Sequence, residues 1–179
     1  MKRYLGLVLG LALAVSASVS AGEMKSASKW QMQIDGGFDV LASNFNTAVY
    51  SGGIGLGVGA GYLVNDNWSF WLNLEDYYLL SNSSGSTNNL VESVLSARYT
   101  FSGTSVKPYL SAGLGTFTQI ASSGGYTLSS SDFMLQGKGG LIFPAGDHFS
   151  FYAEAKVGVI LASVTAIDIP ITGGVMFDL

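Results

Sequence analysis

Seven ionisable residues fall at alternate positions of apolar segments, where a charge is costly unless it is paired. They are Asp35, Glu75, Glu92, Arg98, Lys138, Glu154 and Lys156. Opposite charges held away from water stabilise each other as ion pairs, so these residue types predict a polar network on one face of a sheet. Counted across the turn between their strands, Lys138 falls opposite Glu154. Arg98 is expected to reach Glu75 or Asn73.

Catalytic chemistry has one candidate, the His148-Phe-Ser150 triplet. An imidazole can activate a serine hydroxyl when a third group orients the ring. Glu154 lies well along the strand from His148, which is the only histidine in the chain. The chain also has no cysteine, and its acids show no clustered ligand spacing. We therefore predict no catalytic residues, no cofactor and no metal site.

The ionisable residues lie on segments whose apolar and polar side chains alternate with a period of two, as in a β-strand. Eight segments are predicted, at 29–40, 49–63, 67–80, 90–102, 106–120, 133–143, 148–161 and about 167–179. Short turns at 65–67, 103–105 and 144–147 alternate with longer polar loops at 42–48, 81–89, 121–132 and 162–167. The even count favours an all-β fold, an eight-stranded antiparallel up-and-down transmembrane β-barrel.

The alternation is clearest in the hairpin at 53–75. Glycines occupy positions 53, 55, 57, 59 and 61, so one face of that strand is bare backbone. A turn centred on Asn65 would place Gly59 opposite Trp71. We expect the glycine face to make room for bulky side chains inside a narrow barrel.

Composition and the first residues predict export. Lys2 and Arg3 precede a 12-residue apolar core and a small-residue stretch that ends at Ala21, so residues 1–21 match a cleaved signal peptide. Residues 22–179 are expected to form a single barrel domain, with 6 Lys and Arg against 12 Asp and Glu. That balance argues against nucleic-acid binding. No segment has the 18 or so uninterrupted apolar residues of a transmembrane helix.

Charge indicates which face of the strands looks outward. On the apolar face Asp76 is the one charged residue, whereas the other face carries Asp35, Asp39, Glu75, Glu92, Arg98, Lys107, Lys138, Glu154, Lys156, Asp168 and Asp178. A lysine or arginine that contacts lipid at mid-membrane costs about 2–4 kcal/mol. The segregation therefore predicts that the apolar face contacts lipid. The alternative, a soluble barrel with an apolar interior, would need a more densely charged exterior.

An eight-stranded barrel is just wide enough to be filled by its own side chains. The predicted inward set adds Trp71, Tyr77, Tyr109, Phe117, Met134, Ile142, Tyr152 and Met176 to the charged groups. We expect a packed lumen without an open pore, and a water-filled lumen is the alternative. Near the short turns, an aromatic girdle is expected from Trp30, Trp68, Tyr99, Phe101, Phe143, Phe149 and Phe177.

Three segments resemble the small OmpA/OmpX-like outer-membrane β-barrels, including the opacity-type surface proteins. They are the Gly-rich second strand, Lys-Pro-Tyr-Leu-Ser-Ala-Gly-Leu-Gly at 107–115, and Asp-His-Phe-Ser-Phe-Tyr-Ala-Glu at 147–154. The resemblance implies a place in the outer membrane of a Gram-negative cell, among lipids and lipopolysaccharide. It also implies a last strand recognised by the barrel-assembly machinery, although the chain ends in Leu179 where a Phe is usual.

Function is less tightly specified than fold. We favour a non-enzymatic structural or surface-interaction barrel, expected to be a monomer, and a small channel for small solutes is the alternative. Some barrels of this size modify lipid A, and His148-Phe-Ser150 resembles the His-x-Ser of the deacylase type. His148 falls at a predicted periplasmic turn, however, which is the wrong leaflet for lipid A. The external loops offer few binding anchors beyond Phe45 and Tyr126, so a surface ligand stays open.

Overall fold

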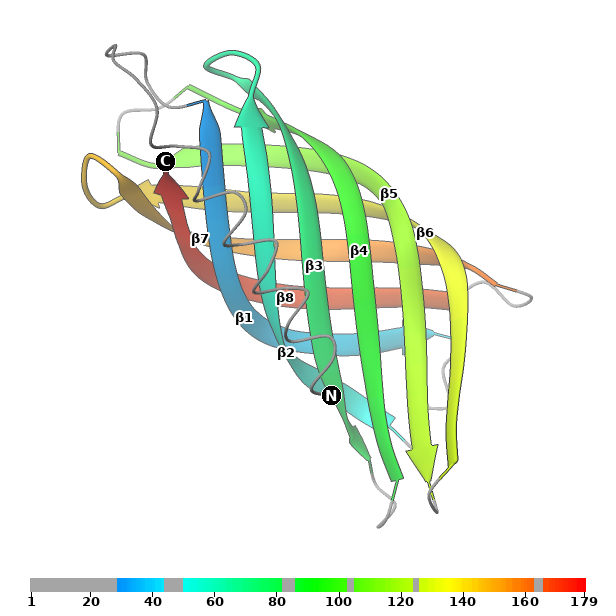
Figure 1. Cartoon of the computed structure of the whole chain (residues 1–179). Helices are drawn as coiled ribbons and strands as arrows, with labels where there is room; N and C mark the ends of the chain where they lie inside the picture. Colours follow the sequence, from blue (N-terminus) through cyan, green and yellow to red (C-terminus); the bar gives the residue numbers. More distant parts are fainter. Residues whose placement is uncertain (1–28, 44–49, 82–85, 103–104, 124–125, 163–165) are drawn as a thin grey trace.

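The structure is a computed structural model that describes residues 29–43, 50–81, 86–102, 105–123, 126–162 and 166–179. Within them, antiparallel strands follow one another around a closed barrel, and the last strand pairs with the first (Figure 1). The strands are β1 (Trp30–Ser43), β2 (Tyr50–Leu63), β3 (Trp68–Ser81), β4 (Ser86–Thr100), β5 (Lys107–Ser123), β6 (Tyr126–Pro144), β7 (Phe149–Leu161) and β8 (Ala166–Asp178). The predicted eight-stranded barrel is confirmed.

Two predictions fall on other parts of the chain. The signal peptide at 1–21 lies outside the described residues, and so does Phe45. Within the described ranges, no helix is long and apolar enough to cross a membrane.

The two ends of the barrel differ in how their strands are connected. We term the end that carries the β2–β3, β4–β5 and β6–β7 connections the turn end, and the opposite end the loop end. In the β2–β3 turn, the side-chain oxygen of Asn65 accepts from the backbone N–H groups of Asn67 (3.0 Å) and Trp68 (2.9 Å). Val64 N–H donates to the Trp68 carbonyl at 2.9 Å. This local bonding closes the turn tightly.

That turn corrects one predicted register. It is centred on Asp66 instead of Asn65, so Gly61 lies opposite Trp71, and Gly59 lies opposite Asn73. The error moves each partner by two residues. Because side chains alternate with a period of two, the predicted faces are unchanged.

At the loop end, the prediction of a loop at 121–132 is wrong. β6 begins at Tyr126 and pairs with β5 as far as Ser123, whereas its pairing with β7 begins only at Phe133 (Figure 1). The segment lacks apolar alternation, but hydroxyl pairs across the strands replace it. Thr118 bonds Ser131 at 2.9 Å, and Ser122 bonds Thr127 at 3.0 Å. Likewise β4 begins at Ser86, inside the loop predicted at 81–89.

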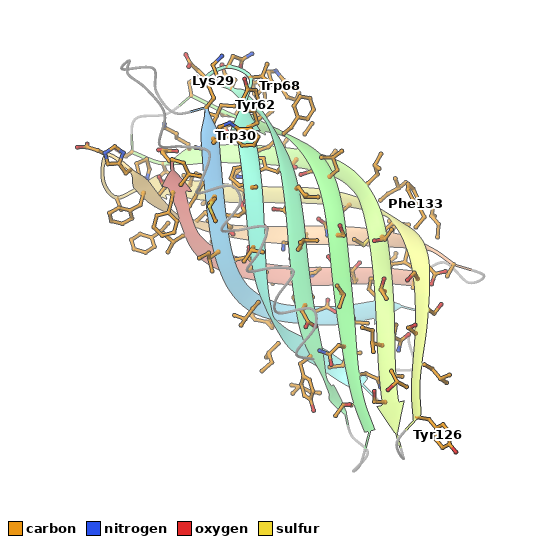
Figure 2. The ribbon with its side chains drawn as sticks, in the orientation of Figure 1. Lys29, Trp30, Tyr62, Trp68, Tyr126 and Phe133 are labelled. Atoms are coloured by element: carbon orange, nitrogen blue, oxygen red, sulfur yellow. The ribbon has the colours of Figure 1, made fainter. Side chains whose placement is uncertain are left out.

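Most of the outward face is apolar, with leucine, isoleucine, valine and aromatic side chains about half exposed. Asp76 is also exposed, and Asn89 donates to it at 2.9 Å. Trp30, Tyr62 and Trp68 gather at the turn end (Figure 2). Edge-to-face contacts join Trp30 to Tyr62 (5.1 Å between centroids) and Trp68 to Tyr99 (5.0 Å). The predicted girdle therefore lies at the turn end of the lipid face.

Candidate functional site

The lumen contains all seven residues of the predicted polar network, and each is at most 4% exposed. At its centre, Lys156 forms ion pairs with Glu75 and with Glu154, the second at 3.2 Å. Lys138 lies 3.5 Å from Glu75 and 3.9 Å from Glu154. Two lysines and two glutamates from three strands, β3, β6 and β7, thus share their charges. A structural or gating role for this network stays a prediction.

The pairing of Lys138 corrects the register predicted for β6 and β7. Lys138 lies directly opposite Lys156, and Glu154 lies opposite Gly140. Like charges that face each other across two strands destabilise a sheet. Here each lysine contacts both Glu75 and Glu154, so the two carboxylates neutralise the two ammonium groups jointly. The ion pair between Lys138 and Glu154 forms diagonally.

Tyrosine and threonine hydroxyls satisfy the remaining carboxylate oxygens of this centre. Tyr77 donates to Glu75 at 2.6 Å, and Tyr109 donates to Glu154. Thr172 also donates to Glu154, at 3.2 Å. Buried carboxylates need such partners, because an unsatisfied lone pair away from water costs about 1–3 kcal/mol.

Asp35 on β1 is a further buried carboxylate that a tyrosine hydroxyl satisfies. Its carboxylate accepts a hydrogen bond from the Tyr152 hydroxyl at 2.7 Å. The predicted network is therefore a set of acids held by both lysines and tyrosines.

Arg98 corrects a second prediction. It lies opposite Ser69, because β4 begins earlier than predicted, and it reaches neither Glu75 nor Asn73. Its guanidinium group lies between two aromatic rings, 4.2 Å from the centroid of Trp71 and 4.4 Å from that of Tyr109. One terminal nitrogen donates to Gln33 at 3.1 Å, and the other contacts the sulfur of Met176 at 3.9 Å. Rings and neutral groups therefore hold this cation.

Toward the loop end, acceptors outnumber donors. Glu92 accepts from the Gln136 amide at 3.0 Å and lies beside the carboxyl group of Asp168. The buried acids of the described lumen, Asp35, Asp39, Glu75, Glu92, Glu154 and Asp168, outnumber the buried cations Arg98, Lys138 and Lys156.

Two apolar clusters enclose this polar layer. The cluster nearer the turn end comprises Trp71, Tyr109, Ile142, Tyr152 and Met176. The cluster nearer the loop end comprises Tyr77, Leu79, Leu90, Val94, Phe117, Met134, Ile160 and Ala166. All eight aromatic and aliphatic residues predicted to point inward are buried. The lumen is therefore filled across its width at two levels.

The glycines of β2 make this filling possible. A Cβ added at Gly55 would meet the Tyr77 ring, and one added at Gly61 would meet the Trp71 ring. At Gly57 an added Cβ would meet the carboxyl group of Asp35. The bare face of β2 is thus occupied by side chains of β3 and β1, as predicted.

Sequence reasoning missed two residues and one contact of the site. Gln33 bridges Arg98 and Asn73, donating to the Asn73 side chain at 3.0 Å. Gln136 binds Glu92, and the stacking of Arg98 on two rings was not foreseen. An alternating pattern could have placed both glutamines on the inward face. Their partners depend on registers that the pattern leaves open.

Residues 8–170 match the family model of the outer membrane protein β-barrel domain. No curated protein matches the chain. Among solved structures, neisserial surface protein A is 22% identical with a TM-score of 0.74, covering 87% of this chain and 100% of that one.

Two further structures share the fold. The N-terminal barrel of OprF from Pseudomonas aeruginosa is 19% identical, with a TM-score of 0.59 and coverage of 85% of this chain and 98% of that one. Ail, the attachment invasion locus protein of Yersinia pestis, is 18% identical, with a TM-score of 0.54 and coverage of 83% and 99%. The family match spans most of the sequence, and the predicted resemblance to small outer-membrane barrels is confirmed. The chain belongs to the outer membrane protein β-barrel domain family.

Proposed function

We propose that this protein is a non-conducting outer-membrane barrel that acts through its surfaces, as a structural element or in contact with a surface partner. The observation that carries the proposal is the filled lumen. Lys156 is fully buried at its centre and Asp168 toward its loop end, and Trp71 and Tyr109 lie on the turn-end side with 1% of their surface exposed. A solute would have to displace both ion pairs and packed rings.

The charge distribution of the loop end limits the partner. After residue 29, the lysines and arginine are Arg98, Lys107, Lys138 and Lys156. Three of them are buried in the lumen, and Lys107 begins β5 at the turn end. No basic residue is therefore available at the loop end. Ail has been solved with the heparin analogue sucrose octasulfate, but a polyanion would find no cation on this surface. A neutral partner, bound through hydrogen bonds and aromatic side chains, fits better.

A lipid A-modifying role has little support from the position of its candidate residues. His148 and Ser150 lie at the turn end, where Ser150 is the second residue of β7 and the His148 carbonyl accepts from Asp178 N–H at 2.9 Å. If the turn end faces the periplasm, these groups lie in the inner leaflet, away from lipopolysaccharide. The proposal therefore assigns the protein no enzymatic activity.

The proposal includes location and assembly. A cleaved leader at 1–21 would deliver the chain to the periplasm, and the last strand would present alternating apolar residues to the assembly machinery. The closed sheet leaves no free edge between β8 and β1, which fits insertion as a monomer. Fractionation of cells that express the full chain should place it with the outer membrane, without residues 1–21.

Planar-bilayer recordings test the filled lumen. The wild-type barrel should give no large, steady conductance. A double variant that truncates the turn-end rings, Trp71→Ala with Tyr109→Ala, should raise the conductance, which shows that the assay detects an opened lumen. A matched variant on the lipid face, Leu72→Ala with Leu110→Ala, should stay silent. Steady conductance from the wild-type barrel would overturn the proposal in favour of a small channel.

A further inference from the structure

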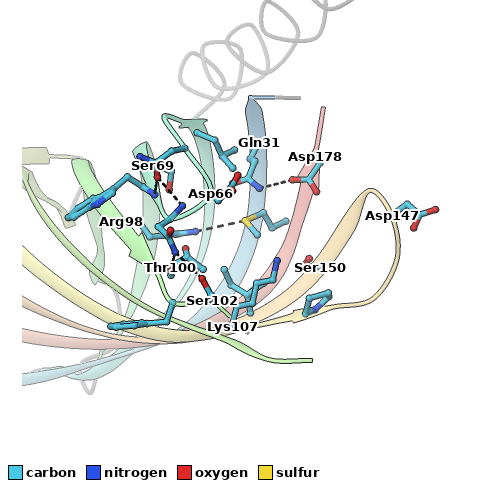
Figure 3. A pocket seen from close by; sticks show the side chains of 18 of the residues that line it. Gln31, Asp66, Ser69, Arg98, Thr100, Ser102, Lys107, Asp147, Ser150 and Asp178 are labelled. Atoms are coloured by element: carbon cyan, nitrogen blue, oxygen red, sulfur yellow. Dashed lines mark hydrogen bonds between the residues drawn. The ribbon is translucent and has the colours of Figure 1, made fainter. Parts of the chain in front are cut away.

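The turn end of the barrel contains a pocket of about 410 Å³ that opens outward between the three short connections. Figure 3 shows Arg98 in this pocket, with Ser69, Thr100 and Lys107 nearby. Ser102, Asp66, Asp147 and Asp178 also line it. Ligand pockets commonly enclose about 300–1,000 Å³, so the space suits a small molecule or a few residues of a peptide.

Arg98 is the unusual residue of this pocket, because it is a buried cation with no carboxylate within ion-pair distance among the described residues. It is 2% exposed, yet the ion pairs of the described lumen all join Lys138 or Lys156 to Glu75 or Glu154. Its Nε has no hydrogen-bond partner among the described residues. A thioether and an amide oxygen are weak substitutes for an anion. A guanidinium group binds carboxylates through two parallel hydrogen bonds, so this side chain suits an anionic ligand.

The charged residues at the rim of the pocket indicate which kind of anion could bind. Lys107 adds a second positive charge, but Asp66, Asp147 and Asp178 also line the opening. Gln31 donates to Asp178 at 2.6 Å, which leaves the negative charge of that carboxylate in place. Three acids at the mouth would repel a phosphate that carries two negative charges. They would attract an ammonium group on a ligand whose carboxylate lies deeper.

We propose that the turn-end pocket binds the carboxyl terminus of a short peptide, with the carboxylate on Arg98 and the peptide ammonium group at the rim acids. The Trp71 and Tyr109 rings hold the guanidinium group in place from both sides, so little side-chain freedom is lost on binding. This inference goes beyond the proposed surface role and concerns the opposite end of the barrel.

Because Arg98 stacks on Trp71, the fluorescence of this tryptophan can be used to measure binding. In the full chain carrying Trp30→Phe and Trp68→Phe, Trp71 is the one remaining tryptophan, and its fluorescence should report on the guanidinium group. Titration with triglycine should change the emission saturably. Triglycine amide, which lacks the carboxylate, should bind about ten-fold more weakly or worse, the size of one lost charge-assisted hydrogen bond. Inorganic phosphate tests a simple anion site.

Each outcome decides the proposal. Equal responses to triglycine and its amide, or no response to either, would overturn it, and so would phosphate binding more tightly than triglycine. Arg98→Gln should abolish the response, and Lys107→Gln should weaken it. Lys29→Gln removes an exposed charge that does not line the pocket and should have no effect. Because Arg98→Gln could impair folding, the comparison of triglycine with its amide uses Arg98 intact.

Discussion

The two faces of β3 follow different rules, although they alternate along one strand. Trp68, Phe70 and Leu72 are between 39% and 55% exposed on the outward face, whereas Trp71 and Asn73 are 1% exposed in the lumen. The outward face meets a uniform solvent, so it requires only apolar character. In the lumen, side chains pack against one another, so each must match particular partners in shape and charge. Substitutions at neighbouring positions should therefore differ in the size and kind of their effect.

The largest effect is expected from removing a shared cation of the lumen. Lys156→Met leaves Glu75 and Glu154 with only Lys138 as a nearby ammonium group. Breaking a buried ion pair in this way costs about 3–5 kcal/mol. Urea unfolding of the barrel in detergent or vesicles would measure the loss.

The neighbouring position provides the control. Val157→Met on the lipid face should change stability by less than about 0.5 kcal/mol. Adding Glu75→Gln to Lys156→Met should restore part of the lost stability, because one uncompensated carboxylate is removed. If Lys156→Met is as mild as Val157→Met, the lumen is hydrated and the contrast between the faces fails.

The second largest loss of stability is expected from a charge placed on the lipid face. Leu72 lies on the lipid face between Trp68 of the girdle and Asp76. Leu72→Arg should cost about 2–4 kcal/mol, the cost of a lysine or arginine facing the bilayer midplane. Leu80→Arg, beyond Asp76 toward the loop end, should cost about 0–1 kcal/mol because it lies near the interface or outside it. Equal losses at both positions would show that neither side chain faces lipid.

Filling the bare face of β2 tests the packing of the lumen. Gly61→Val would drive its side chain into the Trp71 ring, and overpacking of this kind costs about 1–3 kcal/mol. Ala60→Val, one residue away on the lipid face, should be nearly neutral. Adding Trp71→Leu should relieve Gly61→Val. Unfolding midpoints of the single and double variants would check this, and the absence of relief would mean that Gly61 is needed for its backbone.

These contrasts explain how much could be predicted from the sequence. The faces followed correctly from alternation, because an error of two residues in register leaves every side chain on its own side. The partners did not follow, since Lys138 faces Lys156 only because the turn centres one residue later than expected. The β5–β6 extension was missed because hydroxyl pairs such as Thr118 with Ser131 carry no apolar period. Arg98 was expected to reach Glu75 or Asn73, whereas two rings hold it.

The smallest effect is expected at the aromatic girdle, where the lipid face is least uniform. Trp68 contacts Tyr99 edge-to-face at 5.0 Å, and Tyr99 contacts Phe101 in the same way, also at 5.0 Å. Trp68→Leu keeps an apolar side chain but removes the ring, so it should cost about 0.5–1.5 kcal/mol, the value of one aromatic pair. Leu72→Ile at mid-face should be neutral in the same unfolding assay. A double-mutant cycle of Trp68→Leu with Tyr99→Leu isolates the pair, and a coupling energy near zero would mean that the girdle is held by the interface and not by ring contacts.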